Sequence, residues 1–266
     1  MKVVWLGRIE FSEGLQRQAE ALEYCDRTGE ETLFLLEHEP VYTIGRRLDK
    51  SSLGNTAYLP HPVFEINRGG QATYHGPGQL VGYPILDLKK RGKDLHVYLR
   101  SLETAVIRLV ESFGIDAVFC EGKTGVWIEN RKIASIGIGV RRWITMHGFA
   151  LNVSSDLSGF LSITPCGLTG VRMTSLSLEL GREVALEDVR DRAAAVLQAE
   201  FGEAAVGRKV IGEAAGLTWW GEAPKDQDVS LERIDSHRLL DTVRSISAPS
   251  RGLALHRGSD YAISPH

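Results

Sequence analysis

Cysteine is scarce in this chain of 266 residues, which holds only Cys25, Cys120 and Cys166. The number is odd, the three residues lie far apart, and no two of them form a CxxC pair. This pattern argues against a disulfide framework and against a zinc ribbon. Free thiols instead indicate a reducing compartment.

Long apolar runs are also missing. The N-terminal run Val3–Leu6 is far too short for the core of a signal peptide, and no run approaches the roughly 18 residues of a membrane span. We therefore expect a cytoplasmic protein. A large excess of one charge is absent too, because 31 basic and 34 acidic residues give a net charge of −3. This balance argues against nucleic acid and membrane surfaces as partners.

What the chain does have is a mixture of helical and strand-like segments. Apolar residues recur at helical spacing from Ser12 to Gly29, from Leu95 (capped by Asp94) to Phe113, and over Leu186–Phe201. Strand-like segments lie at Val3–Leu6, Leu33–Leu36, Val41–Ile44, Val63–Ile66, Leu80–Leu88, Ile115–Phe119, Gly125–Ile128, Lys132–Val140 and Ile144–Val153. Strands joined as hairpins, without a regular βαβ alternation, predict an α+β or mixed α/β sheet domain.

The composition changes after about Gly216, where paired tryptophans, alternating charges and Ser/Pro/Gly-rich stretches follow. We predict a catalytic or binding domain over residues 1–215. Residues 216–266 are then a loosely packed C-terminal extension with one short helix at Ser230–Ile246. The chain is thus interpreted as one domain with an extension.

A glycine-rich segment, Arg68–Gln79, could hold a ligand, because its glycines let the backbone approach closely and expose N–H groups. It fits neither the Walker pattern nor the dinucleotide fingerprint. Taken alone, a tight turn between two strands is the simpler interpretation. His75 and His147 stand in sheet-like segments without further ligands at metal-binding spacing, so we predict no metal site and a structural or substrate-orienting role.

Two other residues are candidates for chemistry. Cys166 stands between Pro165 and Gly167 at a turn, where a thiol can act as a nucleophile. Cys25 and Cys120 fit a protein core better. Lys132 begins an apolar strand: a desolvated lysine there could act as a base, but a solvated lysine after a turn is the simpler interpretation.

Four ordered motifs make a family resemblance specific. They are Arg68-Gly-Gly-Gln-Ala-Thr-Tyr-His-Gly-Pro-Gly-Gln-Leu-Val-Gly-Tyr-Pro84, Lys132-Ile-Ala-Ser-Ile-Gly-Ile138, His147-Gly-Phe-Ala-Leu-Asn-Val153 and Pro165-Cys-Gly-Leu168. Together they resemble the lipoyl(octanoyl) transferase family, over about residues 1–212. The resemblance implies the mixed-sheet catalytic fold of biotin and lipoate protein ligases. It leaves the extension unexplained.

The resemblance also implies a function: transfer of an octanoyl group from octanoyl-acyl carrier protein to a lysine of lipoyl domains, the first step of protein lipoylation. It assigns Cys166 as the acyl-thioester nucleophile and Lys132 as its partner, without a cofactor. It places the acyl pocket at Arg68, Gly69, Gly70, Gln71, Ala72, Thr73, Tyr74, His75, Ser135, Ile136, Gly137, Gly148, Phe149 and Ala150. Ile136 and Phe149 are expected to wall an apolar tunnel.

The acceptors implied by the resemblance are lipoyl domains of 2-oxoacid dehydrogenase E2 subunits and the glycine cleavage H protein. Both protein partners are acidic, so Arg46-Arg47, Lys89-Lys90-Arg91 and Arg141-Arg142 are candidate contacts, although such groups are more often only solvated. Two alternatives stay open. An ATP-dependent lipoate or biotin protein ligase would form an acyl-adenylate, and a non-catalytic binder of acyl carrier protein would leave Cys166 unmodified.

Overall fold

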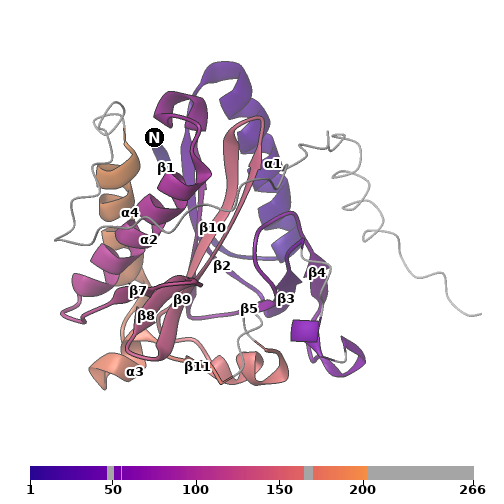
Figure 1. Cartoon of the computed structure of the whole chain (residues 1–266), viewed down its shortest axis with the longest axis vertical. Coiled ribbons are helices and arrows are strands. Elements are labelled where there is room, and N and C mark those ends of the chain that lie inside the picture. The colour runs from indigo at the N-terminus through magenta and orange to yellow at the C-terminus, as the bar shows by residue number, and fades with distance from the viewer. Residues whose placement is uncertain (47–50, 55, 165–169, 203–266) are drawn as a thin grey trace, which may run out of the picture. The chain divides into compact units, whose positions relative to one another are not determined.

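A large mixed sheet forms the centre of the computed structural model, which describes residues 1–46, 51–54, 56–164 and 170–202 (Figure 1). In spatial order its strands are β1 (Lys2–Ile9), β2 (Thr32–His38), β6 (Gln79–Ile85), β10 (Ile144–Asn152), β9 (Arg131–Arg141), β8 (Lys123–Ile128) and β7 (Val118–Cys120). β1 and β2 run parallel, and every other neighbouring pair along this path is antiparallel. The short strand β11 (Arg172–Met173) pairs with the first residues of β9, beyond the end of β10.

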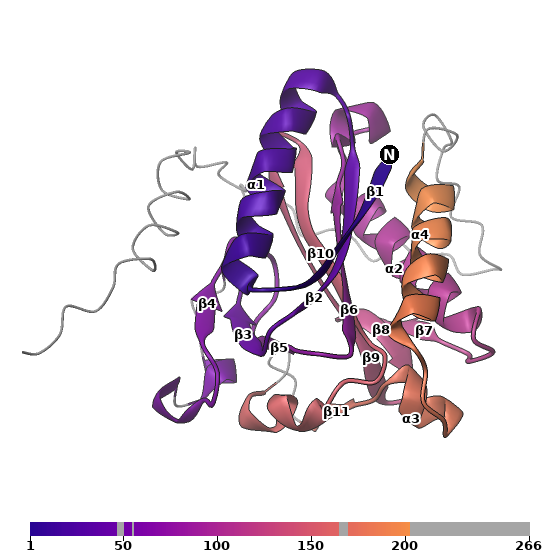
Figure 2. The same ribbon diagram turned by 180° about the vertical axis from the view of Figure 1, so that it is seen from behind.

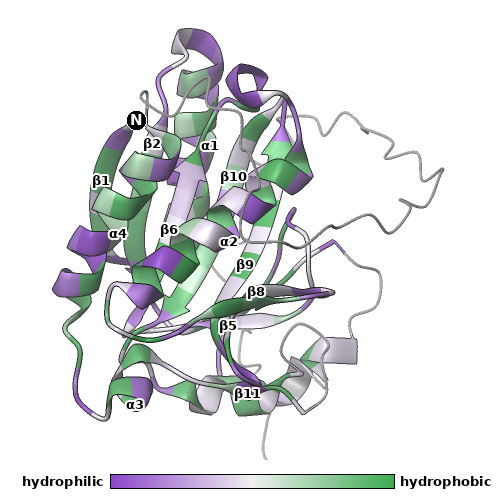
Figure 3. Ribbon diagram, turned by 60° about the vertical axis from the view of Figure 1, so that its left-hand side comes forward, coloured by the Kyte–Doolittle hydropathy of each residue, from purple (hydrophilic) through white to green (hydrophobic). Residues whose placement is uncertain are grey.

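Helices cover both faces of this sheet, as Figures 1 and 2 show from opposite sides. α1 (Phe11–Thr28) packs on one face against β6 and β10, and α2 (Leu95–Glu111) and α4 (Leu186–Phe201) pack together on the other. A one-turn helix, α3 (Leu176–Leu180), follows β11. In Figure 3 the helices carry many of the strongly hydrophilic positions, whereas the central strands are mostly pale to hydrophobic along their length.

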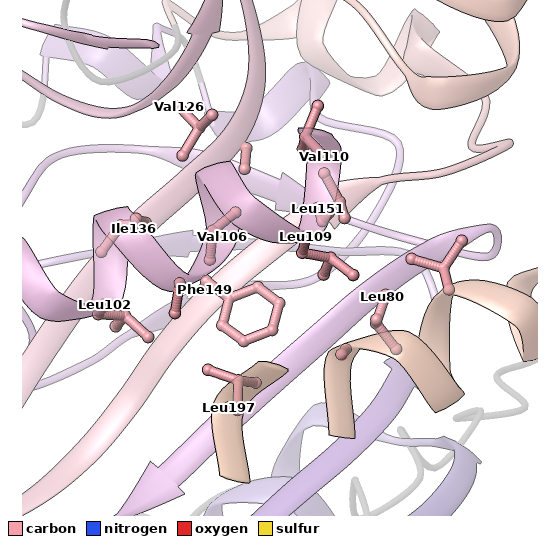
Figure 4. Close-up of a cluster of buried hydrophobic side chains, with 14 of the residues drawn as sticks. Leu80, Leu102, Val106, Leu109, Val110, Val126, Ile136, Phe149, Leu151 and Leu197 are labelled. Atoms are coloured by element: carbon pink, nitrogen blue, oxygen red, sulfur yellow. The ribbon is translucent and has the colours of Figure 1, made fainter. Parts of the chain in front are cut away.

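The larger core lies between the sheet and the α2–α4 pair (Figure 4). Phe149 of β10 is 2% exposed and packs there with Leu102 of α2 and Leu197 of α4. The sequence explains why α2 begins where it does, because the Asp94 carboxylate accepts hydrogen bonds from the backbone N–H groups of His96 and Val97 at 2.8 and 3.0 Å. None of the helices in the described residues is long and apolar enough to cross a membrane.

A second, three-stranded sheet lies beside the lower end of the large one and has the order β4 (Val63–Glu65), β3 (Val41–Ile44), β5 (Thr73–His75). Its own small core is built around Tyr42 and Tyr74 with Phe160. Phe160 belongs to a 3₁₀ turn, Leu157–Ser162. Two further 3₁₀ turns, Ser51–Leu53 and Thr56–Tyr58, lie between β3 and β4.

The strands and long helices predicted from the sequence are confirmed within a few residues. Three short elements were not predicted: β5, which lies inside the glycine-rich segment, β11 and α3. The prediction that Cys120 is a core thiol is wrong, because it ends β7 at the sheet edge and is partly exposed, whereas Cys25 is buried as predicted. The predicted extension and its short helix lie outside the described residues.

Candidate active site

A cavity of about 230 Å³ lies where the segment between β4 and β5 crosses over the large sheet. Its walls come from the ends of α1 and α2 and from strands β5, β6, β8, β9 and β10. Apolar side chains form much of the lining, among them Phe11, Leu99, Ile136 and Phe149. The apolar part of this lining is suited to an alkyl chain, and the polar residues beside it are suited to a polar group on the same molecule.

Glycines in β9 allow the crossing segment to lie directly on the strand. The N–H of Gly69 donates to the carbonyl oxygen of Ile138 at 2.9 Å. A Cβ atom on Gly137 would lie 2.9 Å from Arg68 Cδ, and one on Gly139 would lie 2.4 Å from the carbonyl oxygen of Asn67. Larger residues at these two positions would therefore displace the roof of the cavity.

Arg68 is the buried cation of this roof and is 7% exposed. Its guanidinium donates to the carbonyl oxygen and the hydroxyl of Thr43 at 3.1 and 2.8 Å, and to the carbonyl oxygen of Gly69 at 2.9 Å. These bonds fix Arg68 between the small sheet and the crossing segment. Its positive charge therefore faces the cavity from a rigid position.

Three buried histidines lie near the α1 side of the cavity. His38 Nε2 and the Tyr83 hydroxyl are hydrogen-bonded at 2.7 Å, and His75 Nδ1 and Gln79 Oε1 at 2.8 Å. Burial lowers the pKa of His38 to about 4 and the pKa values of His75 and His147 to about 3. All three imidazoles are therefore neutral at physiological pH and can act as hydrogen-bonding groups. The structural or orienting role predicted for His75 and His147 stays a prediction.

His147 is also the strained residue of this wall. It has a φ of 57° inside β10, and its N–H donates to the buried Gln18 Oε1 at 2.7 Å. A non-glycine residue in this region is uncommon and is held there by its surroundings. The bond from α1 thus fixes the backbone at one end of the cavity.

Two buried polar atoms in the lining have no hydrogen-bond partner within the described residues: Gln71 Oε1 and Thr73 Oγ1. Buried polar atoms are normally paired, because leaving one unpaired costs about 1–3 kcal/mol. Gln71 Oε1 could accept a hydrogen bond from a bound molecule, and the Thr73 hydroxyl could donate or accept one.

The structure brings together most of the predicted pocket residues. All of them line the cavity except Ala72 and Tyr74, which lie in the small core with Tyr42 and Phe160. Strand alternation in β5 explains this difference, because Tyr74 points away from its neighbours Thr73 and His75. Lining residues that the predicted pocket did not include are Phe11, Ile66, Tyr83, Leu99, Gly122, Lys123, Thr124, Ile138 and His147.

Lys132 is fully buried, so the interpretation as a solvated lysine is wrong. Its Nζ donates to the carbonyl oxygen of Thr124 at 2.8 Å and lies 5.5 Å from the centroid of the Trp127 ring. Thr124 lines the cavity, so the ammonium lies next to that wall. β11 covers Lys132 from the other side, where Met173 is its strand partner.

Cys166 lies outside the described residues, as do the other residues of 165–169. The described residues on both sides are anchored near the cavity. The N–H of Thr164 donates to the carbonyl oxygen of Ser52 at 2.7 Å, and the N–H of Thr174 donates to the carbonyl oxygen of Lys132 at 3.0 Å.

The predicted basic contact groups are largely neutralised by acidic residues of their own chain. Arg141 and Arg142 both pair with Glu23, at 3.4 and 2.6 Å, and Lys89 pairs with Asp26 at 3.4 Å. Arg91 forms a two-point ion pair with Glu31. Arg46 is exposed near the crossing segment, and Arg47 lies outside the described residues. The clusters at Lys89–Arg91 and Arg141–Arg142 therefore brace α1 against the sheet.

Comparison with known proteins identifies the family. The model of the lipoyl protein ligase A/B catalytic domain matches residues 11–198, a range that includes every residue of the cavity lining. The chain belongs to this family. Within it, the chain is 51% identical over 196 residues to an octanoyltransferase of Geobacter sulfurreducens, covering 73% of this chain and 82% of the relative. It is 45% identical over 211 residues to an octanoyltransferase of Caldicellulosiruptor bescii, covering 76% of this chain and 92% of the relative.

Solved structures confirm the predicted fold of this lipoyl protein ligase A/B family member. A lipoate-protein ligase A bound with ATP has a TM-score of 0.59 at 16% identity and covers 75% of this chain and 84% of its own. A putative lipoate protein ligase from T. acidophilum with bound lipoic acid has a TM-score of 0.58 at 17% identity, with the same coverage. The mixed α/β architecture is thus that of lipoate ligases.

Proposed function

We propose that this protein is an octanoyltransferase that moves an octanoyl group from octanoyl-acyl carrier protein to a lysine of a lipoyl domain, the first step of protein lipoylation. The proposal rests on a sequence identity of 51% and 50% to two curated octanoyltransferases, over most of their length. The cavity fits this activity, because an apolar tunnel beside a buried ammonium suits a fatty acyl thioester. The scarcity of cysteine favours a cytoplasmic location.

We propose Cys166 as the nucleophile of a two-step exchange. In the first step its sulfur bonds to the octanoyl carbonyl carbon, and the bond to the carrier-protein sulfur breaks. In the second step the neutral amine of the acceptor lysine attacks the same carbon, and the Cys166 sulfur leaves. Each step exchanges one acyl bond for another, so neither requires ATP. The assignment of Cys166 rests on the Pro165–Leu168 motif.

Lys132 would act as the proton-handling partner of that thiol. A thiol of ordinary pKa is only slightly ionised at neutral pH, so it needs a base or a nearby cation. Lys132 is buried next to the cavity and could stabilise the Cys166 thiolate as an ammonium, then give a proton to the departing carrier thiolate. The neutral amine that this leaves could accept a proton from the acceptor lysine in the second step. The Thr73 hydroxyl could donate to the thioester carbonyl, and Gln71 Oε1 could accept from an N–H or O–H group of the carrier's polar arm.

The proposed partners are acyl carrier protein as donor, and lipoyl domains of 2-oxoacid dehydrogenase E2 subunits and the glycine cleavage H protein as acceptors. Both are acidic in this family, so they need basic residues near the cavity. Lys123 is exposed, lines the cavity and makes no ion pair within the described residues. We therefore place the docking contact at Lys123, not at the neutralised clusters beside α1.

We also propose that residues 1–215 carry the whole activity and that 216–266 form a dispensable extension. A chain ending at residue 215 should transfer octanoyl groups at the rate of the full chain. A large loss of transfer by that shorter chain, with its fold intact, would show that the extension takes part in function.

Intact mass spectrometry tests the transferase directly. The protein is mixed with octanoyl-acyl carrier protein, and we expect an added octanoyl mass that Cys166→Ser does not acquire. Lys132→Ala should fold but transfer poorly. An unmodified wild-type protein would indicate a non-catalytic binder. In a parallel reaction with ATP and lipoate, release of AMP would indicate the ligase alternative.

A further inference from the structure

A single peptide group connects a buried carboxylate of α2 to the Lys132 ammonium. The peptide between Thr124 and Gly125 donates its N–H to Glu103 Oε1 at 3.2 Å and accepts a hydrogen bond from Lys132 Nζ on its carbonyl oxygen at 2.8 Å. The N–H and C=O of a trans peptide point in opposite directions. Glu103 and Lys132 therefore hold the same peptide from its two sides.

Both ends of this chain of hydrogen bonds are out of water. Glu103 is 2% exposed and Lys132 is fully buried. The second carboxylate oxygen of Glu103 accepts from Arg100 at 2.6 Å. Burial raises the pKa of Glu103, whereas the bond from Gly125 and the charges of Arg100 and Lys132 act in the opposite direction. A buried carboxylate normally needs hydrogen-bond or charged partners, and here one partner is the peptide that also binds the candidate catalytic lysine.

The peptide is also the point that fixes the path of the lysine side chain. Gly125 has a φ of 125°, and a Cβ atom there would lie 2.5 Å from Lys132 Cε and 2.6 Å from the carbonyl oxygen of Ala134. The lysine stem thus passes directly against the backbone at Gly125. A movement of this peptide would move the ammonium with it. Trp127, which is 2% exposed, bounds Lys132 as well.

We propose that Glu103 is a positioning residue for Lys132, which acts by holding the Thr124–Gly125 peptide against which the ammonium is hydrogen-bonded. This inference rests on the proposed role of Lys132 in octanoyl transfer. Glu103 itself does not touch the substrate: it lies on α2 behind β8 and is not part of the cavity lining. Charge-assisted hydrogen bonds of this kind are stronger than neutral ones, so the carboxylate orders the peptide more firmly than an amide could.

Two variants separate the hydrogen bond between Glu103 and the Gly125 N–H from the negative charge of Glu103. Glu103→Gln can still accept from the Gly125 N–H through its amide oxygen, whereas Glu103→Ala cannot. Glu31→Ala is a matched control, because Glu31 is another largely buried carboxylate in a two-point ion pair with an arginine, far from Lys132 in the sheet. Circular dichroism and thermal melting establish that each variant is folded.

The positional readout is the ε-methylene NMR resonance of Lys132, which Lys132→Met identifies by its disappearance. The Trp127 ring, whose centroid lies 5.5 Å from Nζ, shifts this resonance away from that of a free lysine. We expect Glu103→Ala to move the resonance toward the free value, Glu103→Gln to restore much of the shift, and Glu31→Ala to leave it unchanged. The transfer rate at saturating substrate should fall about tenfold to a hundredfold in Glu103→Ala, with KM for the carrier unchanged, because small misplacements of a reacting group have effects of this size.

An unmoved Lys132 resonance in folded Glu103→Ala would overturn the proposal, as would an equal displacement in Glu31→Ala. The failure of the proposed function gives a different result. If Lys132→Met transfers octanoyl normally, Lys132 is not the catalytic partner, whereas a displaced resonance in Glu103→Ala would still establish that Glu103 positions it.

Discussion

Gly137 of β9 lies directly opposite Gly148 of β10, and Arg68 packs against Gly137, whereas Gly148 packs against Gly82 and Pro84 of β6. The arrangement leaves room for the roof of the cavity to lie on the backbone of the sheet. Both glycines belong to motifs that the sequence alone marks as part of the pocket. Gly137 provides space for the Arg68 segment and Gly148 provides space for the neighbouring strand β6, which explains why both positions need glycine.

The first prediction concerns this space. Gly137→Ala would place a Cβ atom 2.9 Å from Arg68 Cδ and 3.2 Å from the carbonyl oxygen of Gly69. We expect the roof to shift, KM for octanoyl-acyl carrier protein to rise and the free energy of unfolding to fall by about 1–3 kcal/mol, the usual cost of overpacking. Steady-state kinetics and urea unfolding measure both effects. Unchanged KM in a folded variant would contradict this account of the motif.

The second prediction is a pH dependence of stability. Burial lowers the pKa values of His38, His75 and His147 far below the ordinary value of 6.5. The unfolded chain therefore binds more protons than the folded one below pH 6.5, so stability falls as the pH drops from there toward about 4. Each histidine contributes up to about 1.4 kcal/mol per pH unit in this range.

Replacing one histidine should reduce that slope. We expect urea unfolding of His75→Gln between pH 6.5 and 5 to give a smaller slope of the unfolding free energy against pH. The decrease should correspond to about one bound proton. Leu22→Ala is the matched control, because it removes a core side chain of α1 and lowers stability without changing proton binding. An identical slope in His75→Gln and the wild type would mean that His75 titrates in the folded protein.

The third prediction compares two basic residues. Arg142 is paired with Glu23 at 2.6 Å and Asp26 at 3.0 Å, whereas Lys123 stands exposed at the cavity. We expect Lys123→Ala to raise KM for the acidic carrier protein a few-fold and to weaken the dependence of the transfer rate on salt, and Arg142→Ala to do neither. Kinetics at several salt concentrations test this. A larger effect of Arg142→Ala than of Lys123→Ala would instead place the docking surface at the end of α1.

Local sequence patterns predicted most of the fold, because the long helices and central strands follow apolar periodicity and recognisable caps such as Asp94. The short strand β5 was not predicted, because the glycines around it obscure the alternation of apolar and polar residues that is typical of a strand. Its pairing with β3 is a long-range contact. Motif resemblance predicted the pocket segments. Phe11 and Leu99 carried no such signal, because only the packing of α1 and α2 brings them to the cavity.

The burial of Lys132 likewise could not be predicted from its own neighbours in the sequence. A lysine that follows a turn is usually solvated, and here Trp127 and Met173 cover it from two different strands. The link to Glu103 depends on α2 packing behind β8, a contact between residues 22 positions apart or more. Site geometry of this kind comes from tertiary structure, even where the motif names the residue.

The last prediction concerns the length of the acyl chain. If Lys132 is the catalytic partner that we propose, the reacting carbonyl lies on the β8 side of the cavity. We then expect the methyl end of the acyl chain at the opposite wall, where Tyr83 of β6 and Phe11 lie. Phe11→Leu should lengthen the cavity there and raise the rate with decanoyl relative to octanoyl carrier protein. Each newly buried methylene contributes about 0.8 kcal/mol, or roughly fourfold. Phe64→Leu is the control, because Phe64 packs against Phe11, with ring centroids 5.1 Å apart, but is not part of the cavity lining. Competition between the two acyl donors, read by mass spectrometry of the product, measures the preference. An unchanged ratio in Phe11→Leu would place the methyl end elsewhere in the cavity.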